Sequence, residues 1–445
     1  MRARKQRFLG VALWAAILAV PGTADAQAWL SDRDQKTGAG FRTGNLELHP
    51  GVGAETGFQS NVFYRTEEAD GSPILRVVPH LFLSTLGAQR TEGEEHPAPP
   101  KMSFRGGVSA GVYHYFSVER DDVPVEFSAD ADFVLMPERP FSLGLSGEAT
   151  RSIRWTSPVE SATVGTSAGQ SDFGRTNVSP GARVILQTRG GILKTEIGGR
   201  YNLTFYDEGP YQGNDTSELQ ARALTTWSLF PKTAIFHETA FRFRTFGSES
   251  ATTAATSHND GWVLDNRVGV NGAVTKTIGT TLAVGYGAGF FDPEPETDDF
   301  DDFLLQALLR WTPSERNRWH LGYTRTYDLA FQGNYSRSDR VSARVDTFFG
   351  GSFLLGIDGA FTLVTYGPDG VAVAPQNNAS SEDRTDTRLD AGIDGEYRFT
   401  DWLALTASMR YEQLISDYEM GTSATSRQSV EWTNVEAWLG VRAFW

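Results

Sequence analysis

Charged residues stand at every second position in a segment near the C terminus, and the same spacing recurs nearby. Guanidinium and carboxylate groups on one face can ion-pair and can donate or accept hydrogen bonds to water and to the hydroxyl groups of a polar solute. We therefore interpret them as the lining of a wet interior. The candidate lining residues are Arg344, Asp346, Arg388, Asp390, Asp394, Glu396, Arg398, Arg410, Glu412, Trp438 and Arg442. The alternative is that these charges only pair across neighbouring strands and solvate a wall.

Catalysis is not predicted. The chain has seven histidines and no cysteine, which excludes disulfides and thiolate metal sites. No histidine stands with a serine or an acid at the spacing of a hydrolase motif, and Glu238 next to His237 points to the opposite face of a strand. The acidic run at 292–302 lacks the spacing of a calcium loop and holds two prolines. We predict a non-enzymatic protein without a metal or a cofactor, in which this run is a solvated loop.

The elements that position the charged residues are predicted β-strands. In the last segment, one face holds Val435, Ala437, Leu439, Val441, Ala443 and Trp445, and the other face holds Asn434, Glu436, Trp438, Gly440 and Arg442. A period of two with one apolar face is typical of a strand. Eighteen segments between Leu46 and Trp445 follow this pattern.

The connections between these segments alternate in length. Tight links are predicted at 136–140, 188–191, 230–232, 277–280, 313–317, 350–351 and 400–401. Longer polar links are predicted at 156–172, 207–216, 247–260, 292–302, 367–384 and 418–430. Short turns on the periplasmic side and long loops on the other are typical of outer-membrane barrels, although the link at 88–101 is long on the short-turn side.

A soluble β-sandwich also produces alternating strands and is the structural alternative. Eighteen strands would make a large sandwich, and aromatic residues gather near the predicted strand ends, as in the interfacial girdles of membrane barrels. The predicted girdle residues are Trp155, Tyr206, Trp262, Phe290, Trp311, Trp319, Tyr366, Phe399 and Trp402. We predict an all-β fold: a transmembrane antiparallel up-and-down β-barrel of about 18 strands over residues 44–445, with an aqueous lumen.

The N-terminal residues indicate export. Four basic residues, an apolar run at 8–20 and a small-residue site ending at Ala26 predict a signal peptide over residues 1–26. Residues 27–43 are predicted to form a short periplasmic segment. Without residues 1–26, 36 Lys and Arg face 54 Asp and Glu, a net charge of -18, which argues against a nucleic-acid partner.

Two segments resemble a known family. The segment "NLELHPGVGAETGFQSNVFYR" at 45–65, followed by "ILRVVPHLFLSTLG" at 74–87, resembles the opening hairpin of the outer-membrane β-barrel porin families that include the barrels of bacterial exopolysaccharide export. The matching residues are Asn61, Val62, Phe63 and Pro79, whereas Gln59 stands where family members often have an acid. The aromatic end of the chain, with Val441, Ala443 and Trp445 on one face, is similar to the signal that the barrel-assembly machinery reads.

The resemblance implies a pore of the Gram-negative outer membrane for export of a secreted polysaccharide. Its implied partners are outer-membrane lipid and lipopolysaccharide, the barrel-assembly machinery, and a separate periplasmic export protein. A diffusion porin for small solutes is the nearest alternative, with its lumen narrowed by the loop at 366–384, and a structural barrel or an outer-membrane enzyme is a third.

Overall fold

The computed structural model describes residues 40–66, 69–85, 101–118, 124–137, 139–153, 174–188, 190–207, 215–246, 260–291, 299–329, 335–367, 384–416, 419–420, 428–429 and 431–445. The predicted signal peptide at 1–26 lies outside these residues, and so do Trp155 and most of each predicted long loop. Among the residues that the structure describes, no helix has the length and apolar character needed to cross a bilayer.

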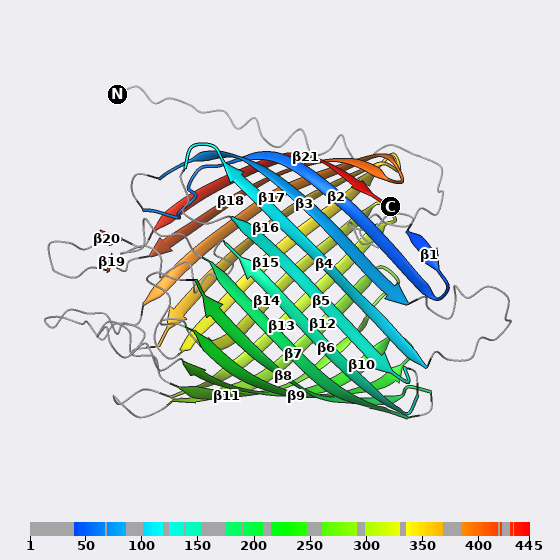
Figure 1. The fold of residues 1–445 in the computed structure, drawn as a ribbon. Coiled ribbons are helices and arrows are strands. Elements are labelled where there is room, and N and C mark those ends of the chain that lie inside the picture. The colour runs from blue at the N-terminus through cyan, green and yellow to red at the C-terminus, as the bar shows by residue number, and fades with distance from the viewer. Residues whose placement is uncertain are drawn as a thin grey trace, which may run out of the picture.

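Long antiparallel strands follow one another along the chain, each paired with the next (Figure 1). Their bounds are β1 Phe41–Thr43, β2 Leu46–Gln59, β3 Ser72–Thr85, β4 Met102–Tyr115, β5 Val125–Leu135, β6 Phe141–Ser152, β7 Arg175–Gln187, β8 Leu193–Tyr206, β9 Thr216–Phe230, β10 Thr233–Phe246, β11 Gly261–Ala273, β12 Ile278–Phe291, β13 Phe300–Ser314, β14 Asn317–Leu329, β15 Tyr335–Phe349, β16 Phe353–Tyr366, β17 Thr385–Thr400, β18 Leu403–Ser416, β19 Glu419–Met420, β20 Gln428–Ser429 and β21 Trp432–Phe444.

The sheet closes on itself. Strand β21 pairs with β18 on one edge and with β2 on the other, where residues 51–59 of β2 run antiparallel to residues 436–444. The 18 strands β2 to β18 and β21 therefore form a closed up-and-down barrel, as predicted. The short β1 adds to the edge of β2, so residues 41–43 of the segment predicted to precede the barrel join the sheet.

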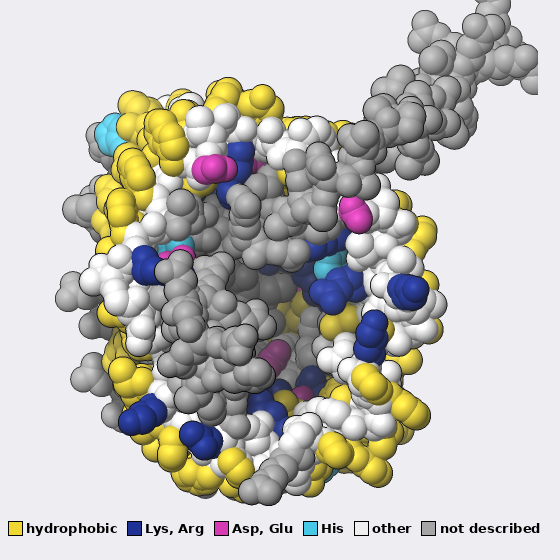
Figure 2. All heavy atoms as spheres, turned by 90° about the vertical axis from the view of Figure 1, so that its right-hand side faces the viewer, with side chains coloured by type: hydrophobic (Ala, Val, Ile, Leu, Met, Phe, Trp, Pro, Cys, Tyr) yellow, Lys and Arg dark blue, Asp and Glu magenta, His cyan; other side chains and the backbone are white. Residues whose placement is uncertain are grey.

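Alternation of side chains separates an apolar outside from a polar inside. In β21, Leu439 and Val441 are exposed on one face of the strand, whereas Asn434 and Glu436 are buried on the other face. Seen from the end that carries the C terminus, apolar side chains cover the outer rim, and Lys and Arg side chains gather around the central hollow (Figure 2). A closed sheet with this distribution suits a bilayer, because it has no free edge at which backbone groups would face lipid unpaired.

Tight turns join the strands at the end of the barrel that carries the C terminus. Gly190 and Gly191 between β7 and β8, and Gly350 and Gly351 between β15 and β16, all have positive φ, which glycine adopts without steric cost. The longer connections, such as those between β6 and β7 and between β16 and β17, lie at the opposite end. The barrel thus has a short-turn end and a long-loop end.

Two strands and two residues differ from what the sequence suggests. Regular alternation of apolar residues begins at Ala182 in β7 and at Val341 in β15, but the strands begin at Arg175 and Tyr335, because polar inward residues fill the first half of each strand. The prediction that Tyr206 and Tyr366 belong to the girdle is wrong, since both side chains are buried on the inward face. Side chains alternate between the two faces of a strand, and these two tyrosines share the face of the inward residues of β8 and β16.

We expect Phe444→Ala to lower the free energy of unfolding by about 3 kcal/mol, because Phe444 is fully buried inside the barrel beneath the Arg398 guanidinium, 4.7 Å from its ring centre. Denaturant unfolding in lipid vesicles, followed by tryptophan fluorescence, measures this loss. Leu439→Ala on the outer face of the same strand is the control and should cost less. An equal loss in the two variants would contradict the assigned faces.

Candidate functional site

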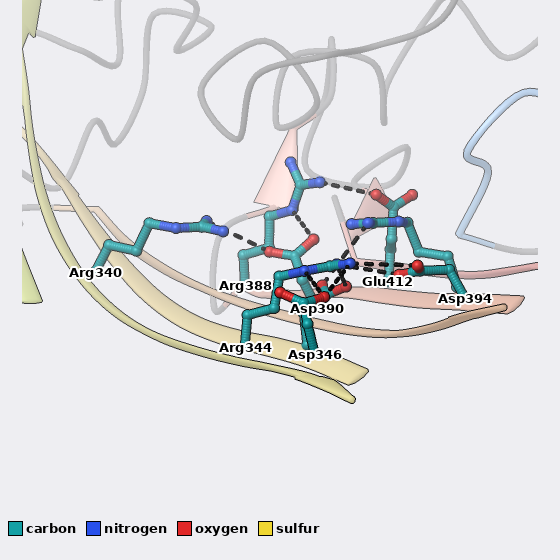
Figure 3. A network of polar contacts seen from close by, with 9 residues as sticks. Arg340, Arg344, Asp346, Arg388, Asp390, Asp394 and Glu412 are labelled. Atoms are coloured by element: carbon teal, nitrogen blue, oxygen red, sulfur yellow. Dashed lines mark hydrogen bonds and ion pairs between the residues drawn. The ribbon is translucent and has the colours of Figure 1, made fainter. Parts of the chain in front are cut away.

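The predicted lining residues lie on the face of the sheet opposite the exposed apolar side chains. In β17, Ile393 and Tyr397 are exposed on the outside, and the charged residues between them point to the other face. The structure brings most of the predicted set together on β15, β17 and β18, around the intervening β16 (Figure 3). Trp438 and Arg442 lie on β21, which pairs with β18, and Trp438 lines a cavity together with Asp394 and Arg410.

Arg344 is the centre of the largest network. Its guanidinium lies 2.8 Å from Asp346 on the same strand, 3.1 Å from Asp358 on β16 and 3.0 Å from Asp394 on β17 (Figure 3). Arg410 of β18 approaches Asp358 from the other side at 3.7 Å. One cation thus holds three carboxylates that would otherwise repel each other.

A second group lies beside this network. Arg388 pairs with Asp390 at 3.0 Å and with Glu412 of β18 at 3.1 Å, and Arg340 of β15 approaches Asp390 at 3.6 Å. Figure 3 shows these pairs beside the Arg344 network. Arg398 and Glu396 form a separate buried pair at 2.7 Å. The inner wall is therefore laced across strands by ion pairs, which stiffen it and still leave several charged groups exposed to the lumen.

A third group lies at the seam where β2 meets β21. Glu55 accepts hydrogen bonds from Arg76 of β3 and from Arg442 of β21, the latter at 3.2 Å. The Arg76 guanidinium also lies 4.3 Å from the Trp438 ring centre. The sequence analysis did not select Glu55 and Arg76. Both alternate with outward-facing residues along their strands, and this alternation could have identified them as inward-facing.

The first long-loop connection folds into the barrel. Asn61 is buried, donates hydrogen bonds to the carbonyl oxygens of Arg65 at 2.8 Å and Thr433 at 3.2 Å, and accepts one from the Arg65 amide. Tyr64 has a φ of 53°, a costly conformation for a tyrosine, and packs edge-on against Trp432 at 4.8 Å. The Asn-Val-Phe motif thus ties this loop to the inner face beside the seam.

A second segment that folds inward is formed by the end of β14 and the start of β15, at the long-loop end of the barrel. The pairing of β13 with β14 runs from Ser314 to Leu305 and does not continue to Phe300, whereas β14 and β15 stay paired up to Leu329 and Tyr335. Tyr327 shares a strand face with the outward Trp319, which is 38% exposed, yet Tyr327 is only 4% exposed. It stacks at 4.7 Å on Phe300, on the inner face of β13. We call residues 326–329 and 335–339 the inward hairpin.

Two arginines of β10 hold the inward hairpin across the lumen. Arg242 donates to the Asp328 carboxylate at 2.5 Å and to the Tyr327 carbonyl at 2.8 Å, and Arg244 donates to the Leu329 carbonyl at 2.8 Å. Strands β11, β12 and β13 lie between β10 and β14 in the wall, so the hairpin crosses their inner faces. The first loop lies on the opposite side of the ring, and the two segments narrow the long-loop end from both sides.

The interior keeps open space around these groups. One large cavity has a volume of about 830 Å³ and lies between β9 and β18 towards the short turns, where Lys232, Arg310 and Arg344 line it. Cavities of about 210 Å³ and 410 Å³ flank the inward hairpin. The predicted narrowing loop at 366–384 falls almost entirely outside the described residues.

Within the part of the chain that the structure describes, no three His, Asp or Glu side chains are grouped to hold a metal ion. Only the end of the acidic run at 292–302 belongs to that part. There Asp299 accepts a hydrogen bond from the Phe291 amide at 3.2 Å, and Asp301 and Asp302 accept from the hydroxyls of Tyr286 and Tyr327. These three acids therefore accept hydrogen bonds from residues of β12 and β14.

The fold and its lining define a class: a transmembrane β-barrel whose interior is polar, ion-paired and open to water over part of its length. A family model described as "Putative beta-barrel porin 2" matches residues 149–434, more than half of the chain, and the chain belongs to this family. The match lies outside the segments at 45–65 and 74–87, so the two likenesses involve different parts of the chain.

The solved structures that match this chain share little of its sequence. The FrpB iron transporter of Neisseria meningitidis is 9% identical, with a TM-score of 0.47 and coverage of 91% of this chain and 82% of that chain. A mutant of the ferric enterobactin receptor PfeA of Pseudomonas aeruginosa is 9% identical (TM-score 0.45, coverage 89% and 80%). OmpT of Vibrio cholerae is 9% identical (TM-score 0.39, coverage 91% and 100%). No curated protein matches the sequence.

The Arg242→Ala, Arg244→Ala double variant should release the inward hairpin. Each lost hydrogen bond to a charged group is worth about 1.5 kcal/mol or more, so we expect amide exchange at 326–329 and 335–339 to rise at least about tenfold. Hydrogen–deuterium exchange with mass spectrometry measures this rate. Arg200→Ala, which removes an exposed pair with Glu148, is the control. Unchanged exchange in the double variant would show that the arginines do not hold the hairpin.

Arg344→Ala should destabilise the barrel by about 2 kcal/mol, because three carboxylates then lose their shared cation. Adding Asp394→Asn should recover part of this loss, because one of the repelling charges is removed. Urea unfolding of the two variants and the unchanged protein measures both effects. If the second substitution adds to the loss, the network is not what balances these charges.

Proposed function

We propose that the protein is a channel of the outer membrane of a Gram-negative bacterium, that it conducts a secreted polysaccharide, and that it is not an enzyme. The observation that carries the proposal is a closed barrel of 18 strands whose charged inner wall surrounds a cavity of about 830 Å³. Side chains fill a barrel of about eight strands, whereas about 16 to 18 strands leave an aqueous channel. Membership of a β-barrel porin family supports the same class.

Polysaccharide as the cargo has two kinds of support. The segments at 45–65 and 74–87 resemble the opening hairpin of barrels of exopolysaccharide export, and Asn61 of that motif anchors a loop inside the lumen. Carboxylates, guanidinium groups and the serine and threonine hydroxyls of the inner wall are suitable partners for sugar hydroxyls. In this proposal a separate periplasmic export protein delivers the polymer at the short-turn end.

Insertion into the outer membrane follows from the same proposal. The barrel-assembly machinery would read the outer face of β21, where Val441 and Trp445 are exposed beside Ala443. Outer-membrane lipid and lipopolysaccharide would then surround the apolar outer face. The basic N-terminal residues and the apolar run that follows them would direct export across the inner membrane.

A diffusion porin for small solutes is the second candidate. The inward hairpin favours it, because porins narrow their lumen with a segment that folds inward, and here Arg242 and Arg244 fix that segment in place. The two functions differ in the size of the solute that must enter. A polymer conduit has to admit many linked sugars in a row, whereas a porin admits single small solutes.

Single-channel recording in a planar bilayer tests the proposal with the protein that begins after residue 26. We expect stepwise openings, and we expect neutral oligosaccharides of increasing length to block the current for increasing times. A steady current that is indifferent to sugars would favour the diffusion porin. If a correctly folded barrel, judged by its faster migration on gels before heating, carried no current, the channel function would be wrong.

A further inference from the structure

Basic side chains dominate the large cavity at the short-turn end, although the whole chain carries a net charge of -15. Among the described residues that line this cavity, Asp358 is the only acidic one. Six basic residues line the cavity, and we call them the basic lining: Lys232, Arg310, His320, Arg340, Arg344 and Arg410. Figure 2 looks into the barrel from this end and shows Lys and Arg side chains around the hollow.

Strand register places three members of the basic lining in one row. Arg310 of β13 stands directly opposite His320 of β14, and His320 stands directly opposite Arg344 of β15. Residues that are directly opposite in antiparallel strands point to the same face, so the side chains of Arg310, His320 and Arg344 all face the lumen. The row spans two strand spacings, about 10 Å.

The charges of the basic lining are compensated by acids on one side only. Arg344 and Arg410 share Asp358, and Arg340 is 3.6 Å from Asp390. At the other side, neither Lys232 nor Arg310 forms an ion pair with any described residue. Lys232 sits in the turn before β10, at the short-turn end of the lumen. The surplus positive charge therefore faces the solvent on the side of β9, β10 and β13.

A neighbouring cavity shows that this surplus is local. The cavity of about 330 Å³ beside β18 and β21 is lined by the acids Glu126, Asp358, Asp394, Glu412 and Glu436 and by only two arginines, Arg76 and Arg410. The lumen thus carries a basic region and an acidic region next to each other. A solute with negative charges is attracted to the first region and repelled by the second.

We propose that the basic lining binds the carboxylates of an acidic oligosaccharide, so that the polymer carried by this channel contains uronic acids. This inference rests on the proposed function and names its substrate class. Arginine suits the role because its planar guanidinium binds a carboxylate through two parallel hydrogen bonds. Gly272, Gly279, Gly322 and Ser342 also line the cavity, and their small side chains leave room for a sugar ring. Carboxylates on successive sugars would meet successive cations of the basic lining, beginning with Lys232 and Arg310.

The test uses calorimetric binding of galacturonate oligomers to the detergent-purified barrel. We expect affinity to rise with oligomer length, because each further carboxylate meets another cation, and a neutral malto-oligosaccharide to bind at least about tenfold more weakly. The Lys232→Gln, Arg310→Gln double variant should weaken the binding of the longest oligomer at least about tenfold. These two side chains make no ion pair among the described residues, so their loss should leave the fold intact.

The matched control is Lys194→Gln, Arg200→Gln. It removes the same two charges from the inner face of β8, outside the large cavity, where Lys194 pairs with Glu196 and Arg200 with Glu148. This control should bind the oligomer as the unchanged protein does. Equal weakening in the two double variants would overturn the proposal, because net charge alone would then explain binding. Equal affinity for the monomer and the longest oligomer would also overturn it.

A bilayer measurement separates this inference from the proposed function. The reversal potential in a salt gradient should favour anions, and the Lys232→Gln, Arg310→Gln variant should lower that preference. An open channel without oligomer binding would refute the basic lining as a site and leave the channel standing. Oligomer binding that the variant abolishes, in a barrel that carries no current, would support the site and refute the channel.

Discussion

The pairing of the first long strand with the last is the constraint on which the rest of the structure depends. In lipid, each unpaired backbone group costs several kcal/mol, so a sheet that spans a membrane has to close. Residues 51–59 of β2 meet residues 436–444 of β21, and polar side chains reinforce the seam from inside. Glu55 joins Arg76 to Arg442, and Asn61 joins the first loop to Thr433. Closure also decides which face of every strand is inside.

The interior follows from closure and alternation together. Each strand sends every second side chain inward, and 18 strands enclose more space than those side chains fill. The remaining water permits charged residues, which pair across strands around Arg344 and Arg388. At the long-loop end, two segments turn inward and take up part of the space. Towards the short-turn end, a cavity of about 830 Å³ has a mainly basic charged lining. The two ends of the lumen therefore differ in shape and in charge.

The strand count, the closed topology and the inward faces were predictable because a period of two is a local property of the sequence. The inward hairpin was not, since Tyr327 has the parity of the lipid-facing Trp319 and becomes buried only because β14 leaves β13 near its end. The row of Arg310, His320 and Arg344 was also hidden, because it depends on the register between three strands. Tyr366 is a different case: its place at a strand end suggested a girdle residue, although the parity that places it inside was readable from the sequence. Whether the predicted lining residues contact a solute stays a prediction.

Disulfide formation across the seam tests the central claim, closure of the sheet, most directly. The chain has no cysteine, so Val52→Cys with Ala443→Cys introduces a single pair at directly opposite positions. Directly opposite residues lie within the reach of a disulfide. The account predicts that the bond forms under mild oxidation in membranes and that Thr56→Cys with Ala443→Cys, four residues out of register, stays reduced. Failure of the first pair, or equal bonding of both pairs, would contradict a closed barrel in this register.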